Sequence, residues 1–234
     1  MNRVIAIGAV LLVGMAEQVY ADTVSIAASG ASSYNVVARA RNGRSGFEGQ
    51  LSTPGSVNAN MNPVGAPVWA YGSLYNFRFT YTAATGESTW SIDFNRDNDF
   101  LDAQEAVSTT TGSLAGKTFS RASLYLQGNA TASVSVQSFN LNGFNFGPFS
   151  AGNGVTDTFF QSSSGQFGDI TATGSFSFSA NGGSDEMPRM WLRFGDAVPL
   201  TVVPLPPAAW AGLGALGTCF GVVSLRRRRN NAAE

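Results

Sequence analysis

Residues 74–82 are Leu74-Tyr75-Asn76-Phe77-Arg78-Phe79-Thr80-Tyr81-Thr82, with aromatic side chains at odd positions and polar ones at even positions from 76 on. Side chains alternate between the two faces of a β-strand, so this stretch predicts a strand with one buried face and one wetted face. Residues 89–94, Thr-Trp-Ser-Ile-Asp-Phe, repeat the pattern. Residues 83–88 between them predict a hairpin loop, in which Gly86 is free to adopt a positive φ.

The same period of two continues downstream, in residues 170–178 and again in a last strand around 190–194. Residues 133–141 change phase between Val136 and Phe139, which predicts a β-bulge or a tight bend. Gly, Ser, Thr and Asn interrupt the chain at short intervals, as is typical of antiparallel sandwiches. The sequence therefore predicts one all-β domain, an antiparallel β-sandwich with an aromatic core, over residues 22–198.

The first 21 residues have the pattern of a secretory signal peptide. A short positive start at Arg3 precedes the apolar run 4–16, and small residues stand at Val19 and Ala21. We therefore expect cleavage after Ala21, so that the mature chain starts at Asp22. An uncleaved N-terminal anchor is the alternative.

The C-terminal part has three segments in a fixed order. Residues 199–207 form a Pro-rich linker, residues 208–225 are apolar, and residues 226–234 are a basic tail. An apolar run of about 18 residues suffices to cross a thin membrane as a helix, and the arginines hold its end in the cytoplasm. An ordinary tail anchor with a Pro-rich stalk is the alternative. The residues that define the pattern are Val203, Pro204, Leu205, Pro206, Pro207, Arg226, Arg227, Arg228 and Arg229.

This tail resembles the PEP-CTERM sorting signal of bacterial envelope proteins, here in a Val-Pro-Leu-Pro-Pro-Ala-Ala-Trp form. The resemblance implies an exosortase-like membrane peptidase as partner. It also implies transient residence in the inner membrane, followed by the cell envelope or extracellular matrix. Residues 68–93 resemble, at the level of pattern, the central hairpin of lectin-like jelly rolls and of the "choice-of-anchor" domains found ahead of such tails. That likeness implies a jelly-roll-like sandwich.

Composition excludes several kinds of chemistry. The chain has no histidine, and its one cysteine, Cys219, lies in the apolar tail segment. This removes Ser-His-Asp and Cys-His nucleophiles, most zinc, copper and iron sites, and disulfides in the body. Thirteen acidic and nine basic residues give residues 22–198 a net charge of −4, without the basic stripe that nucleic-acid binding needs. Because acidic residues outside one loop are scattered, a non-enzymatic role is favoured over a matrix polysaccharide hydrolase.

That loop is residues 93–105, Asp-Phe-Asn-Arg-Asp-Asn-Asp-Phe-Leu-Asp-Ala-Gln-Glu. Oxygen ligands at alternate positions suit Ca²⁺ in a secreted protein. The EF-hand template fits at its start, where Asn98 stands in place of glycine and can take the left-handed conformation that glycine normally provides. The template fails by one residue at its end, where Gln104 precedes the acid. The candidate ligands are Asp93, Asn95, Asp97, Asp99, Asp102 and Glu105.

Residues 90–105 resemble the loop of secreted bacterial β domains of the GEVED type, which implies a bend around a bound ion. The alternative from the residues alone is a solvated acidic turn, in which Asp102 caps a helical turn and Glu105 is its capping-box partner.

Two aromatic residues, Tyr125 and Trp191, stand on the phase opposite to their apolar neighbours. We expect them to be exposed and to stack on sugar rings; the alternative is that they cover a sheet edge or pack under a loop. Arg39, Arg41 and Arg44 predict a solvated basic loop. The sequence thus favours an exported, non-enzymatic structural or matrix-associated protein, stabilised by Ca²⁺. The alternative is a carbohydrate-binding module for extracellular polysaccharide.

Overall fold

The computed structural model describes residues 22–43, 46–55, 58–61, 69–100, 102, 105–183 and 186–197. The predicted signal peptide, linker, sorting motif, apolar segment 208–225 and basic tail lie outside these residues. Within the described residues, no helix is long and apolar enough to cross a membrane.

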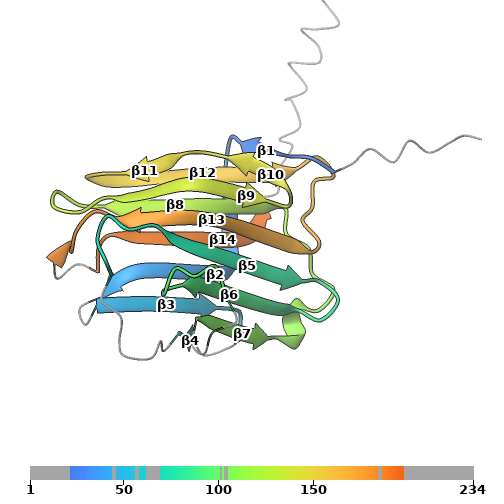
Figure 1. The fold of residues 1–234 in the computed structure, drawn as a ribbon. Coiled ribbons are helices and arrows are strands. Elements are labelled where there is room, and N and C mark those ends of the chain that lie inside the picture. The colour runs from blue at the N-terminus through green and yellow to red at the C-terminus, as the bar shows by residue number, and fades with distance from the viewer. Residues whose placement is uncertain are drawn as a thin grey trace, which may run out of the picture. The chain divides into compact units, whose positions relative to one another are not determined.

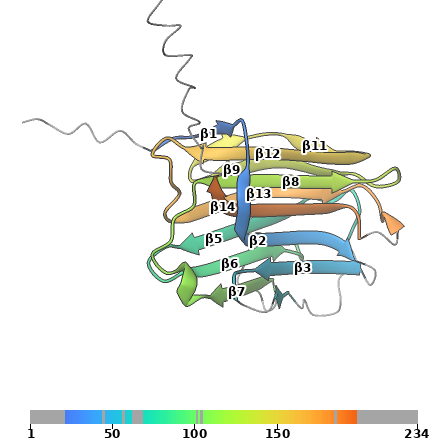
Figure 2. The ribbon, with the colours of Figure 1, turned by 180° about the vertical axis from the view of Figure 1, so that it is seen from behind.

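Two antiparallel sheets of seven strands each pack face to face; Figure 1 looks onto the second sheet and Figure 2 onto the first. The first sheet has the order β1 (Val24–Ala27), β12 (Gly154–Ser162), β8 (Arg121–Gly128), β14 (Arg189–Ala197), β2 (Ala31–Gly43), β3 (Gly46–Ser52) and β4 (Ala59–Asn60). The second has the order β10 (Phe144–Phe146), β9 (Val134–Leu141), β13 (Ile170–Phe178), β5 (Tyr75–Thr82), β6 (Glu87–Asp93) and β7 (Ala106–Thr110), with β11 (Phe149–Ala151) beside β9. The predicted all-β antiparallel sandwich is confirmed.

The hairpin that the sequence predicts is formed by β5 and β6. Buried and half-buried side chains alternate along β5 as the aromatic pattern requires. Gly86 has a φ of 71°, and a Cβ there would lie 2.6 Å from the carbonyl oxygen of Thr111. The turn therefore needs glycine both for its backbone conformation and for space.

The predicted phase change in β9 is a bulge. Ser138 pairs with Ser175, but Val136 pairs with the next residue, Phe176, so Gln137 is the extra residue. Val136 and Phe139 are three residues apart and would point to opposite faces of a regular strand. The extra residue in the bulge lets both side chains point into the core.

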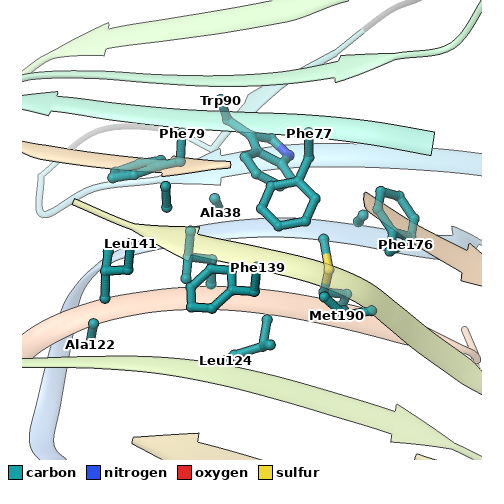
Figure 3. Packing of buried hydrophobic residues seen from close by; sticks show 14 of the residues in the cluster. Ala38, Phe77, Phe79, Trp90, Ala122, Leu124, Phe139, Leu141, Phe176 and Met190 are labelled. Carbon is teal, nitrogen blue, oxygen red and sulfur yellow. The ribbon is translucent and has the colours of Figure 1, made fainter. Parts of the chain in front are cut away.

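Aromatic side chains from the second sheet fill the space against smaller residues of the first (Figure 3). Trp90 on β6 is completely buried and packs against Phe77 on β5, with ring centroids 5.5 Å apart. Its indole N–H donates to the carbonyl oxygen of Arg39 on β2, 3.0 Å away. Trp90 therefore joins the two sheets by packing and by a hydrogen bond.

Asp22, the residue that we expect to start the mature chain, is bound to the end of β12. Its carboxylate accepts hydrogen bonds from the hydroxyls of Ser162 (2.6 Å) and Ser163 (2.8 Å) and from the backbone N–H of Ser164 (3.1 Å). These bonds, led by that of Ser162, lower the pKa of Asp22 to about 2. They fasten the start of the domain beside β1, the edge strand that pairs with β12.

We expect Asp22→Asn to destabilise the protein at pH 6, but by at most about 1 kcal/mol because this carboxylate is exposed. A lowered pKa contributes stability above the unfolded value of 3.8, and this contribution is lost as the pH falls toward 2. Urea unfolding of both proteins between pH 6 and pH 3 should show the difference shrinking. A difference that does not change with pH would contradict this role.

Candidate functional site

The acidic loop leaves β6 at Asp93, whose carboxylate is completely buried although it stands on the polar phase of the strand. One carboxylate oxygen accepts the backbone N–H groups of Arg96 (2.6 Å) and Asp97 (3.2 Å). The other accepts the N–H of Asn98 at 3.0 Å. Asp93 therefore organises the loop from inside, because its oxygens gather three successive N–H groups.

Two residues of the loop are left-handed: Arg96 has a φ of 66° and Asn98 a φ of 67°. Asn98 thus takes the left-handed conformation that the sequence predicts for it, at the position where the EF-hand template has glycine. Non-glycine residues are uncommon in this region, and asparagine is among those that adopt it most readily.

The side-chain amide of Asn95 links two exposed acidic residues of the loop. The side-chain NH₂ of Asn95 donates to carboxylate oxygens of Asp97 (2.9 Å) and Asp102 (2.7 Å). The other oxygen of Asp97 accepts the backbone N–H of Asp99 at 2.8 Å. Two negative side chains therefore share one neutral amide donor.

Glu105 lies beneath the loop and is only 4% exposed. Its Oε1 accepts the backbone N–H groups of Phe94 (2.7 Å) and Asn95 (3.2 Å). Its Oε2 is buried and has no hydrogen-bond partner among the described residues. Burial raises the pKa of Glu105, as do the charges of Asp93 and Asp102, while the two N–H groups act in the opposite direction.

The alternative role of Glu105 as a capping-box partner of Asp102 does not agree with this geometry. The carboxylate reaches the start of the loop, and what links Asp102 to Glu105 is a backbone hydrogen bond of 3.2 Å. Residues 101, 103 and 104 lie outside the described part of the chain.

As the side chains stand, no group of three or more His, Cys, Asp or Glu in the described residues is arranged to hold a metal ion. The donor chemistry nevertheless suits a hard cation, because carboxylate and amide oxygens are the ligands of Ca²⁺. A cation would replace the neutral amide of Asn95 as the partner of Asp97 and Asp102, and would satisfy the buried oxygen of Glu105.

The predicted aromatic pair forms a second candidate site. Tyr125 on β8 and Trp191 on β14 are half-buried on the outer face of the first sheet and stack on each other, with ring centroids 5.1 Å apart. The guanidinium groups of Arg39 and Arg189 lie 5.1 Å and 4.7 Å from the Trp191 ring centroid. Two cations thus flank the indole ring of Trp191. The ring is half-buried, whereas the alternation of side chains along the sequence predicts an exposed one.

The prediction of a solvated basic loop is wrong for Arg39 and Arg41, which lie in β2, while Arg44 is outside the described residues. The two arginines alternate with Ala38 and Ala40, which are completely buried. That alternation is the signal that identifies a strand, although small alanines make it weak.

No family model matches the chain, and the curated proteins contain no match to it. What the two sites can bind therefore follows from their own residues.

Proposed function

We propose that this protein is exported and non-enzymatic, and serves as a structural or matrix-associated protein of the cell envelope. In this proposal an exosortase-like peptidase cuts its tail after the helix 208–225 has held it transiently in the inner membrane. The support is the order of the targeting patterns at both ends of the sequence.

The body would display a polar surface outside the cell. We propose a jelly-roll-like topology of the choice-of-anchor kind, supported by pairings between strands far apart in sequence: β1 with β12, β2 with β14, and β5 with β13. Such pairings tie the start of the domain to its end, which would stabilise a body that has no cysteine.

We also propose that one Ca²⁺ orders the loop between β6 and β7. The observation that carries this proposal is the buried Oε2 of Glu105, which lacks a partner among the described residues. An unpaired buried carboxylate oxygen is costly, and the acids gathered above it repel one another. The ligands would come from Asp93, Asn95, Asp97, Asp99, Asp102 and Glu105, and the ion would serve stability rather than catalysis.

Mass spectrometry of the protein from its native cell tests the export proposal. We expect a mature chain that starts at Asp22 and ends near residues 203–207. Replacing Arg226, Arg227, Arg228 and Arg229 by serine should weaken membrane retention and orientation, because these charges favour the cytoplasmic side. A main species that ends at Glu234 in the mature envelope would contradict processing by an exosortase-like peptidase.

A further inference from the structure

The outer face of the first sheet carries ordered rows of side chains, set by the strand register. Trp191 on the central strand β14 stands between Tyr125 of β8 and Arg39 of β2. Along β14, Arg189 and Arg193 flank Trp191 on the same face, since residues two apart point to the same side. Four arginines from two strands thus surround one aromatic pair, namely Arg39, Arg41, Arg189 and Arg193.

Two of these arginines are neutralised within the domain. Arg41 forms ion pairs with Glu48 and Glu186, and Arg193 forms one with Asp157. These charges hold the face together but leave little capacity for a ligand.

The other two arginines have neutral partners. Arg39 donates to the amide oxygen of Gln50, and Arg189 donates to that of Gln127. Among the described residues, neither has a carboxylate within 4.0 Å. Both guanidinium carbons lie within 5.1 Å of the same Trp191 centroid, so two guanidinium groups without a carboxylate of their own face one small area. Because Arg41 pairs with two carboxylates, the four arginines exceed the three carboxylates of this face by one positive charge.

The surroundings of Arg39 disfavour its charge. Burial lowers the pKa of Arg39, and the neighbouring charges of Arg41 and Arg189 lower it further. The Nε of Arg39 and the indole nitrogen of Trp191 are both buried without a partner in the described part of the chain. An anion at this position would offset the repulsion between Arg39 and Arg189.

A hollow of about 460 Å³ adjoins Arg39 on this face, where β2 and the end of β3 meet. Its lining combines the Tyr34 ring, the hydroxyls of Ser33 and Ser52, the amide of Asn35 and the guanidinium of Arg39. The guanidinium of Arg193 lies over the Tyr34 ring, 4.3 Å from its centroid, and so covers one face of this ring. Hydroxyl and amide groups around an aromatic ring suit a sugar, whose hydroxyls need partners and whose ring carbons need an apolar surface.

We propose that this face binds an acidic polysaccharide, with the carboxylate of a uronic acid unit at Arg39 and Arg189 and a neighbouring sugar in the hollow beside Tyr34. Guanidinium groups match the planar, two-oxygen geometry of a carboxylate. Trp191 holds the arginines in place and is not itself the platform for the sugar. The inference goes beyond the proposed function, because it concerns the folded domain and requires neither tail processing nor calcium.

Calorimetric titration tests the inference on the full chain in a neutral detergent, with a chelator present so that the acidic loop plays no part. The probes are polygalacturonate and its fully methyl-esterified form, which share a backbone and differ in charge. We expect binding of polygalacturonate that weakens with added salt, and little binding of the ester. The doubly substituted protein Arg39→Gln/Arg189→Gln should lose at least about tenfold in affinity, because two charge-assisted contacts are removed.

Arg78→Gln is the matched control, because Arg78 also lies over an aromatic ring, that of Phe100, but on the second sheet. It should leave affinity unchanged within about twofold. Arg39→Lys/Arg189→Lys keeps both charges and serves where the glutamine variant fails to fold; it should still bind several-fold more weakly, since lysine lacks the planar fork.

Three outcomes would overturn the proposal. The first is equal binding of the methyl ester, and the second is full affinity in either double variant. The third is binding of dextran sulfate or single-stranded DNA as tight as that of polygalacturonate, which would show general attraction of anions rather than recognition of a carboxylate on a sugar.

Discussion

Trp90→Ala is expected to lower the free energy of unfolding by about 3–5 kcal/mol, the usual range for removing a large aromatic side chain from a core. Trp90 is completely buried and lies between the sheets, with Phe77 beside it and smaller residues of the first sheet opposite (Figure 3). The cavity would be lined from both sheets, so neither sheet alone can collapse into it. Urea unfolding followed by circular dichroism measures the loss.

Trp90→Phe separates the two contributions of this residue. It keeps an aromatic ring but removes the N–H that donates to the carbonyl oxygen of Arg39, so we expect a smaller loss of about 1–2 kcal/mol. Trp191→Ala is the control, because this second tryptophan is half-buried on the outer face and should cost about 1 kcal/mol or less. An equal loss for Trp90→Ala and Trp191→Ala would contradict the division into a core face and an outer face.

Much of the fold follows from local pattern. Alternating aromatic residues in 74–82 become β5, Gly86 makes the turn, and the phase change in 133–141 is a bulge. Each of these features depends on residues close together in the sequence, where the period of a strand and the needs of a tight turn act directly. Asn98, left-handed as expected, belongs to the same group.

Other features depend on strand order, which local pattern does not determine. Arg39 and Arg189 meet only because β2 lies beside β14, although 150 residues separate them in the sequence. Asp22 likewise reaches the three serines at the end of β12 only because β1 pairs with β12. Asp93 was expected on a wetted face, yet it is buried because backbone N–H groups of its own loop replace water.

Calcium in hundredfold excess over its dissociation constant is expected to stabilise the protein by about 2.7 kcal/mol, or about 5–11 °C in melting temperature for a domain of this size. The ion would bind only the folded loop, in which hydrogen bonds from Phe94 and Asn95 fix the carboxylate of Glu105. Magnesium should act more weakly, because an irregular loop suits the looser coordination of calcium. Thermal melts with calcium, magnesium and chelator measure these shifts.

Glu105→Gln should abolish the calcium shift while changing the ion-free melt little, because the amide keeps the shape and the acceptor for Phe94 but lacks the charge. Asp97→Ala should do the same, and it also relieves repulsion among the exposed acids. Glu87→Gln is the matched control: Glu87 lies at the opposite end of β6 and is exposed, so this variant should keep the full shift. The calcium proposal would be contradicted if calorimetry shows no calcium binding up to millimolar concentration and the melts are unchanged. Residues 93–105 would then be a solvated acidic turn. The buried oxygen of Glu105 would then have to be satisfied by water or by a proton, as its raised pKa allows.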